Sequence, residues 1–298
     1  MAQTVLLTGG TGFIGSHLAN FLFNRGFEII LYTKNPHLAP RTYRTISTLQ
    51  EIEKLPLLNT VINLAGAHVF AKRWTPEYQQ VLYDSRITTT LDLIAHLRKF
   101  ERLPKVFISA SATGYYLGQH VKCYEDTPVP EVENLSNRLC TAWEDSAKSL
   151  LADDVRLCFM RLGTVLGPKG GFLKRVERLF RLGMGAILGN GTQVMSWVHL
   201  EDCLNAFWHV MQNENLSGPF NIVAPKTCTN AEFSKQLAMQ FGKKPLMYLP
   251  AWVVKALFGK RGEELMLQGI YVVPNRLQQS GFFFKYADIN SALQSFYS

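Results

Sequence analysis

Cysteines are few in this sequence, and their arrangement suits neither a disulfide framework nor a metal site. The 298 residues include five cysteines, an odd number, and no two of them form a C-x-x-C pair. The seven histidines show no H-E-x-x-H or comparable ligand spacing. We therefore expect no disulfides and no bound metal.

Long apolar segments and targeting signals are also lacking. No apolar run approaches the roughly 20 residues that a membrane helix needs. The N-terminus enters an apolar segment directly, without a basic region or a cleavage site. With 47% hydrophobic and 18% charged residues the composition is not that of a disordered chain, and the length predicts one to two domains. These features predict a cytoplasmic globular protein with no membrane partner.

Acidic residues are in the minority, but the basic excess is not concentrated anywhere. There are 31 Lys and Arg against 23 Asp and Glu, a formal charge of +8. A nucleic-acid binder usually gathers its basic residues on one stripe or tail. Here the densest groups are short, such as Lys72-Arg73 and Lys243-Lys244. We therefore expect no nucleic-acid partner, and the excess charge suits a small polyanionic ligand better.

Apolar strands alternate with helical patterns through the first half of the chain. This alternation predicts an α/β fold with a doubly wound parallel sheet that helices cover on both faces. The expected strands are residues 5–7, 27–32, 61–64, 106–109 and 155–160, and the expected helices are 13–23, 76–99 and 134–152.

The alternation weakens after about residue 165. Asp202 is expected to cap the helix that follows it. We also expect one more strand at 221–223, a helix from the capping box at Thr229 to about 241, a helix at 250–258 and an aromatic strand at 282–284. The predicted domains are a nucleotide-binding core at 1–165, with parts of 200–225, and a smaller C-terminal substrate-side lobe at 166–298.

A glycine-rich turn joins the first strand to the first helix. Glycines allow a tight turn and let the backbone approach a pyrophosphate, whose charge the free N–H groups of the helix N-terminus then stabilise. The position at the first strand–helix junction is where a Rossmann-type dinucleotide site requires it. The predicted cofactor-binding residues here are Gly9, Gly10, Thr11, Gly12, Phe13, Ile14 and Gly15.

The end of the second strand indicates which dinucleotide binds. An Asp or Glu there would bind the ribose 2′-hydroxyl of NAD, but this sequence has Thr33 and Lys34. The Thr33 hydroxyl can donate a hydrogen bond, and Lys34 can pair with a 2′-phosphate. NADP(H) is therefore the predicted cofactor, the alternative being that Lys34 is a solvated loop residue.

Two further segments follow the third expected strand. The backbone of Leu64, Ala65 and Gly66 is placed to line the adenosine and ribose. Arg86 can reach a phosphate, or it can be a surface residue paired with Asp84 or Glu77.

Taken together, these motifs resemble the extended short-chain dehydrogenase/reductases, and more narrowly the YfcH-like subgroup of epimerase-family proteins. The resemblance implies a Rossmann core, bound NADP(H), and a cleft between the core and a C-terminal module at about 245–293. It adds Ser109, Arg161 and Gly163 to the cofactor site, although Arg161 can instead form an internal salt bridge. The residues that carry it are 8–15, 63–66, 73–75, 85–86, 109–116, 143–144, 161–168, 189–191 and 197–202.

The same resemblance implies a catalytic Ser, a Tyr, and a Lys four residues after that Tyr. Ser111 matches the serine, but none of the eleven tyrosines has Lys four positions later. The Tyr position falls on Cys140 and the Lys position on Glu144, which would raise the pKa of that thiol. The candidates for proton transfer are therefore Tyr115 or Tyr116 as a phenol, Glu144 as a base and Cys140 as an acid, or none of them if this helix face is only packed.

The predicted function is an NADP(H)-dependent oxidoreductase or epimerase with an atypical active site and a small-molecule substrate. The alternative is a non-catalytic protein that binds NADP(H) and acts as a regulatory or sensor protein. The resemblance also allows a homodimer through the helices at 85–99 and 134–152. Substrate and reaction direction do not follow from the sequence.

Overall fold

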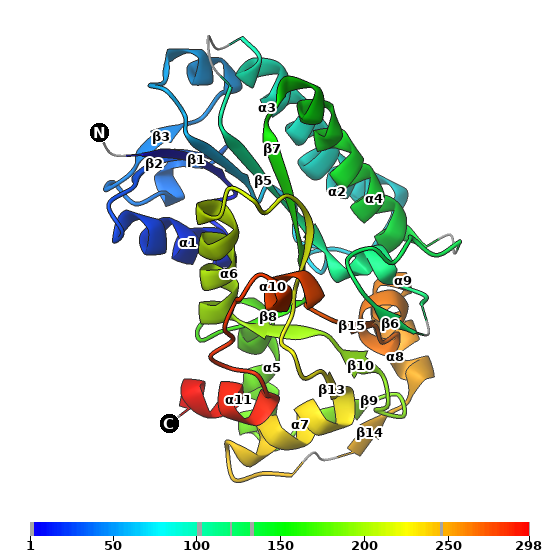
Figure 1. Ribbon diagram of the computed structural model, residues 1–298. Helices are drawn as coiled ribbons and strands as arrows, with labels where there is room; N and C mark the ends of the chain where they lie inside the picture. The colour runs from blue at the N-terminus through cyan, green and yellow to red at the C-terminus, as the bar shows by residue number, and fades with distance from the viewer. Residues whose placement is uncertain (1–2, 100–102, 120, 132–133, 245–246, 298) are drawn as a thin grey trace.

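A seven-stranded parallel sheet forms the centre of the computed structural model, which describes residues 3–99, 103–119, 121–131, 134–244 and 247–297 (Figure 1). The strand order is β12-β7-β5-β4-β1-β2-β3, and all neighbours pair in parallel. This confirms the predicted doubly wound sheet. The strands are β1 (Thr4–Thr8), β2 (Glu28–Tyr32), β3 (Arg44–Ile46), β4 (Thr60–Asn63), β5 (Val106–Ala112), β7 (Arg156–Leu162) and β12 (Gly218–Ile222).

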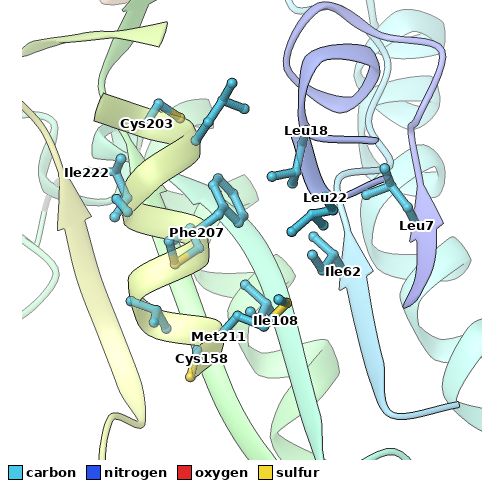
Figure 2. Close-up of a cluster of buried hydrophobic side chains, with 14 of the residues drawn as sticks. Leu7, Leu18, Leu22, Ile62, Ile108, Cys158, Cys203, Phe207, Met211 and Ile222 are labelled. Carbon is cyan, nitrogen blue, oxygen red and sulfur yellow. The ribbon is translucent and has the colours of Figure 1, made fainter. Parts of the chain in front are cut away.

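Helices cover both faces of this sheet, because its central strands are apolar on both sides. Leu7 and Ile108 point into a core with Leu18 and Phe207 on one face, shown in Figure 2. Phe107, the neighbour of Ile108 in the strand, belongs to the core on the other face. The covering helices are α1 (Phe13–Phe23) and α6 (Leu200–Gln212) on one side and α2 (Pro76–Tyr83), α3 (Thr89–Leu97) and α4 (Leu135–Ala147) on the other (Figure 1).

The rest of the chain gathers below the carboxyl ends of the strands as Figure 1 is drawn. Within the described residues it holds four two-stranded sheets: β8 (Thr164–Leu166) with β11 (Trp197–His199), β9 (Ala186–Leu188) with β14 (Met247–Leu249), β10 (Val194–Met195) with β13 (Cys228–Thr229), and β6 (Lys122–Cys123) with β15 (Tyr271–Val272). Its helices are α5 (Gly171–Arg181), α7 (Asn230–Met239), α8 (Ala251–Phe258), α9 (Lys260–Gly262), α10 (Asn275–Gln279) and α11 (Ile289–Tyr297).

Several local predictions are confirmed and others are wrong. The capping box at Thr229 opens α7, as predicted. The expected helix 76–99 is interrupted by a π-helical turn at Asp84–Thr88, and the expected helix 134–152 changes to a 3-10 turn at Lys148–Asp153. The predicted strand 282–284 is wrong, since these residues pair with no strand; Phe284 packs into the core and Phe283 is 84% exposed.

The predicted domain division near residue 165 stays a prediction, and residue 245, where the predicted C-terminal module starts, lies outside the described residues. No helix in the described part of the chain is long and apolar enough to cross a membrane.

Candidate dinucleotide and active site

The glycine turn lies at the point where the strand order reverses, between β1 and β4. This is where open parallel sheets bind ligands, because the loops from β1 and β4 leave in opposite directions. The Thr8 hydroxyl donates to the Asn63 side-chain oxygen at 2.6 Å and accepts from the N–H of Ala65 at 3.0 Å. These buried hydrogen bonds hold the Leu64–Gly66 segment against the end of β1.

Glycine is required within the turn on steric grounds. Gly9 has a φ of 67°, and a Cβ there would lie 2.5 Å from the carbonyl oxygen of Leu64. A Cβ on Gly15 would collide with the carbonyl oxygen of Gly9. Gly12 is the N-cap of α1 and contributes no capping side chain, so the first N–H groups of the helix have no side-chain acceptor there. The turn therefore has the close backbone approach and the free donors that a pyrophosphate needs.

The two residues proposed to choose the nucleotide lie directly after β2. Thr33 is buried, and its hydroxyl oxygen accepts from the N–H of Asn35 at 3.1 Å. Lys34 is exposed. Its contact with a 2′-phosphate stays a prediction, but nothing in the fold covers the ammonium group.

Arg86 lies in the π-helical turn and is 9% exposed. Its guanidinium donates to the carbonyl oxygens of Ala67 (3.0 Å) and Leu82 (3.2 Å), and it packs against Gly66. The expected alternative, a surface arginine paired with Asp84 or Glu77, is wrong. Burial lowers the pKa of Arg86, and among the described residues no carboxylate forms a salt bridge with it. A buried cation beside the Gly66 loop fits an anionic ligand.

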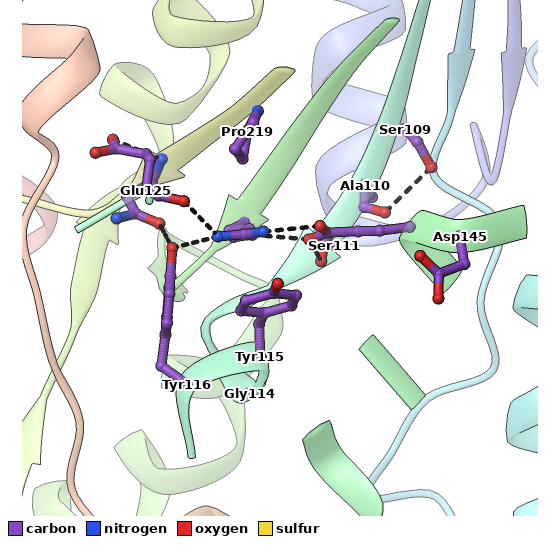
Figure 3. A network of polar contacts seen from close by, with 12 residues as sticks. Ser109, Ala110, Ser111, Gly114, Tyr115, Tyr116, Glu125, Asp145 and Pro219 are labelled. Carbon is purple, nitrogen blue, oxygen red and sulfur yellow. Dashed lines mark hydrogen bonds and ion pairs between the residues drawn. The ribbon is translucent and has the colours of Figure 1, made fainter. Parts of the chain in front are cut away.

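A second buried arginine connects the residues that were predicted from the missing Tyr–Lys pair (Figure 3). Arg161, on β7, donates to both carboxylate oxygens of Glu144 at 2.8 Å. Ser111, at the end of β5, donates to the same carboxylate at 2.7 Å. Burial alone would disfavour the charged guanidinium, but its bonds to Glu144 outweigh this and raise the pKa of Arg161. Arg161 therefore forms the internal salt bridge that was one of its expected alternatives, and its contact with a cofactor or substrate stays a prediction.

The two tyrosines occupy different environments. Tyr116 is fully buried, its hydroxyl donates to Asn221 at 2.9 Å and accepts from Arg161, and burial raises its pKa far above the usual value. Tyr115 is only partly buried, and its ring lies 3.6 Å from the guanidinium carbon of Arg161. Figure 3 shows the Tyr115 ring beside that of Tyr116, and the two ring centroids are 5.1 Å apart. Of the two phenols, Tyr115 is the one that a ligand can reach.

Cys140 is placed beneath the turn that carries Tyr115. A Cβ on Gly114 would lie 3.4 Å from its sulfur. Burial, together with the charge of Glu144, raises the pKa of the Cys140 thiol to about 12. A buried thiol with a raised pKa releases its proton poorly, which weighs against the predicted role of Cys140 as an acid. All five cysteines are free and buried.

Three residues near this network were not predicted. Asn221 accepts from Tyr116, and Glu125 receives the N–H of Asn221 at 3.1 Å. Lys148 is hydrogen-bonded to Asp145, which raises its pKa, and the charge of Glu144 acts in the same direction. Of these three residues, only Lys148 could have been found from the sequence. It stands four residues after Glu144, a spacing that places two side chains on the same face of a helix.

The remaining predicted residues make contacts within the fold, and the cofactor contacts of Ser109 and Gly163 stay predictions. The Ser109 hydroxyl donates to a neighbouring carbonyl, and a Cβ on Gly163 would lie 2.6 Å from the carbonyl oxygen of Ser196. Trp74 anchors its loop through the carbonyl of Val69. His199, and not the predicted Asp202, caps α6; Asp202 instead accepts two backbone N–H groups from the segment after 284. The described residues contain no cluster of three potential metal ligands.

A cavity of about 770 Å³ lies elsewhere, and none of the predicted site residues lines it. Its walls come from three segments distant in sequence, including Gly118, Lys122, Gln193, Gln268 and Tyr271.

The fold and the glycine turn define a Rossmann-type dinucleotide-binding protein. More specifically, the chain belongs to the NAD dependent epimerase/dehydratase family, whose model matches residues 5–223. A second model, a domain of unknown function (DUF1731), matches residues 249–296. The resemblance to extended short-chain dehydrogenase/reductases is confirmed by these matches.

Relatives match almost the whole chain. The human epimerase family protein SDR39U1 is 33% identical over 293 residues, which cover 97% of this chain and 98% of the human protein. The epimerase family protein SAR0825 of Staphylococcus aureus is 32% identical over 297 residues, covering 98% of each chain. The crystal structure of human SDR39U1 (isoform 2) with NADPH superposes with a TM-score of 0.90 at 32% identity and 99% coverage of both chains.

More distant structures share the fold alone. The UDP-glucose 4-epimerase of Thermotoga maritima, solved with UDP-glucose, has a TM-score of 0.79 at 20% identity, covering 99% of this chain and 98% of the epimerase.

Proposed function

We propose that this protein binds NADP(H) between β1 and α1 and acts as an oxidoreductase or epimerase on a small substrate. The observation that carries the proposal is the glycine turn after β1, where Gly9 and Gly15 leave no room for a Cβ, at the same carboxyl edge of the sheet as the half-buried Tyr115, whose ring lies 3.6 Å from the guanidinium carbon of Arg161. Family membership and the NADPH in the human relative's structure support the cofactor.

The chain's own residues fit a dinucleotide with a 2′-phosphate. The α1 N-terminus offers free N–H groups, and Arg86 offers a buried positive charge that no described carboxylate neutralises. Lys34 is exposed at the end of β2, where it replaces the acidic residue typical of NAD sites. When bound, the cofactor supplies or accepts the hydride.

Proton transfer is then assigned to Tyr115. The Lys that should accompany a catalytic Tyr is absent, but one cation lies near this phenol: the Arg161 guanidinium, against the ring face. In the reducing direction Tyr115 gives its hydroxyl proton to the substrate oxygen as hydride reaches the attached carbon, and in the oxidising direction it takes that proton back.

Ser111 is assigned to orientation of the substrate through a hydroxyl that does not react. Because the hydroxyl hydrogen of Ser111 points to the Glu144 carboxylate, its oxygen is free to accept a hydrogen bond from such a hydroxyl. Glu144, held by both Arg161 contacts, fixes the direction of the Ser111 hydroxyl.

The test combines NADPH titration with a screen of carbonyl compounds and sugar nucleotides, followed by NADPH absorbance. We expect tight NADPH binding and oxidation with at least one substrate. Tyr115→Phe should lower kcat by about 10²–10⁴-fold, the usual effect of removing a general acid, with NADPH affinity unchanged. Tyr124→Phe, an exposed tyrosine of the following loop, is the control and should retain full activity.

Two results would contradict the proposal. Absence of NADPH binding would remove the cofactor assignment. Tight binding with no turnover across the screen would favour the alternative function, an NADP(H) sensor.

A further inference from the structure

The C-terminal segment that matches the domain of unknown function reaches the active-site helix. Its π-helical turn Glu263–Leu267 places Glu264, which is 8% exposed, at the N-terminus of α4. The Glu264 carboxylate accepts from the N–H of Leu135 at 3.3 Å and from the N–H and hydroxyl of Ser136 at 3.1 and 2.7 Å. A carboxylate satisfies the free N–H groups of a helix's first turn and is favoured there by the helix dipole.

The first turn of α4 also contacts the 3-10 turn Thr113–Tyr116, which carries Tyr115. The Asn137 side chain donates to the carbonyl oxygens of Gly114 and Tyr115, both at 2.9 Å. A Cβ on Gly114 would lie 3.3 Å from the Ser136 Cβ, so this part of the helix and the Tyr115 turn are in direct contact. Two helical turns further along, α4 carries Glu144.

The same C-terminal segment contacts other loops of the site. Arg261 donates to the carbonyl oxygen of Phe70, in the loop that follows Gly66, at 3.1 Å. The carbonyl of Met266 accepts from Gln193, which lines the cavity, at 3.0 Å. Glu264 differs from these neighbours because its contacts reach the helix that bears the network.

We propose that Glu264 is a positioning residue: the C-terminal segment fixes the start of α4 through Glu264, and α4 fixes Tyr115 through Asn137. The expected effect on catalysis rests on the function proposed above, but the positioning of the Tyr115 turn by Glu264 through α4 does not. This assigns the C-terminal segment the task of completing the active site of the nucleotide-binding domain.

Cys140 reports on this link, because its sulfur lies between the start of α4 and the Gly114 turn. The experiment labels the native protein with N-ethylmaleimide and follows each of the five cysteines by peptide mass spectrometry. Glu264→Ala should raise the labelling rate of Cys140 by about tenfold, since local opening exposes the thiol, while the other four cysteines change by less than about twofold.

The adjacent Glu263 supplies the matched control. Its carboxylate pairs with Lys255 at the surface, with 43% of its side chain exposed. Glu263→Ala should leave Cys140 protected. Should Glu264→Ala fail to fold, Ser136→Ala removes only the 2.7 Å hydroxyl contact and should raise Cys140 labelling by about threefold.

Unchanged Cys140 labelling in the folded Glu264 variant would overturn the proposal, as would an equal rise at all five cysteines, which indicates general destabilisation. Cysteine labelling needs neither NADPH nor substrate, so its result can be distinguished from a failure of the proposed function. In an active enzyme Glu264→Ala should lower kcat about tenfold with NADPH affinity within about twofold. An unchanged kcat would overturn the link to Tyr115.

Discussion

Removal of the Glu144 carboxylate should destabilise the protein strongly, because it leaves a buried charge without its partner. The side chains of Arg161 and Glu144 are only 4% and 5% exposed, and two 2.8 Å contacts join them. Breaking a buried ion pair from one side costs about 3–5 kcal/mol, because the remaining charge keeps its desolvation penalty and loses its compensation. Ser111 would lose its acceptor as well. We therefore expect Glu144→Ala to lower the free energy of unfolding by about 3–5 kcal/mol.

The measurement is urea unfolding followed by tryptophan fluorescence and circular dichroism. Asp145→Ala is the matched control on the same helix: its ion pair with Lys148 is more than half exposed, and its loss should cost less than about 1 kcal/mol. The double variant Glu144→Leu/Arg161→Met replaces both charges with apolar groups and should be more stable than Glu144→Ala. The reasoning is refuted if Glu144→Ala costs no more than Asp145→Ala, or if the double variant is the least stable of the three.

Three other predictions concern the cofactor and the pH dependence of stability. Lys34→Asp should weaken NADPH binding about tenfold or more, because a charge-assisted contact is lost, and should shift the preference toward NADH. Titration with both nucleotides measures this, and the control Lys235→Asp, on the surface of α7, should change neither affinity. Gly15→Ala should abolish NADPH binding in the same titration, because its methyl group would displace the Gly9 carbonyl. Burial lowers the pKa of His199 to about 4, so the folded protein keeps this side chain neutral while the unfolded chain takes up a proton below about pH 6.5. The free energy of unfolding should therefore fall by about 2 kcal/mol as the pH is lowered from about 7.5 to 5, and His199→Asn should lose this decrease. An identical pH dependence of the free energy of unfolding in the variant would contradict the prediction.

Much of the dinucleotide site could be predicted from local sequence, because its requirements are local. A glycine turn between an apolar strand and an amphipathic helix fixes both the element boundary and the anion-binding end of the helix; α1 begins and ends at the expected residues. The capping box at Thr229 is local in the same way. The errors fall where tertiary contacts decide. Phe282 and Phe284 follow a strand-like pattern but pack on the core without a pairing strand, and α6 takes its cap from His199 because Asp202 is drawn to distant backbone N–H groups.

The sequence alone determined the fold class, the glycine turn, the basic residue after β2 and the absence of the Tyr–Lys pair. Each of these depends on residues that are neighbours in the chain, where backbone geometry and periodicity act directly. Only the tertiary structure decided which residues meet around Ser111 and Tyr115. Arg161 and Glu144 are 17 residues apart and Glu264 and Ser136 are 128 apart, and they meet because parallel strands and a returning C-terminal segment bring distant parts of the chain to one edge of the sheet. Burial at that edge then makes each charge depend on its partner, which no spacing in the sequence reveals.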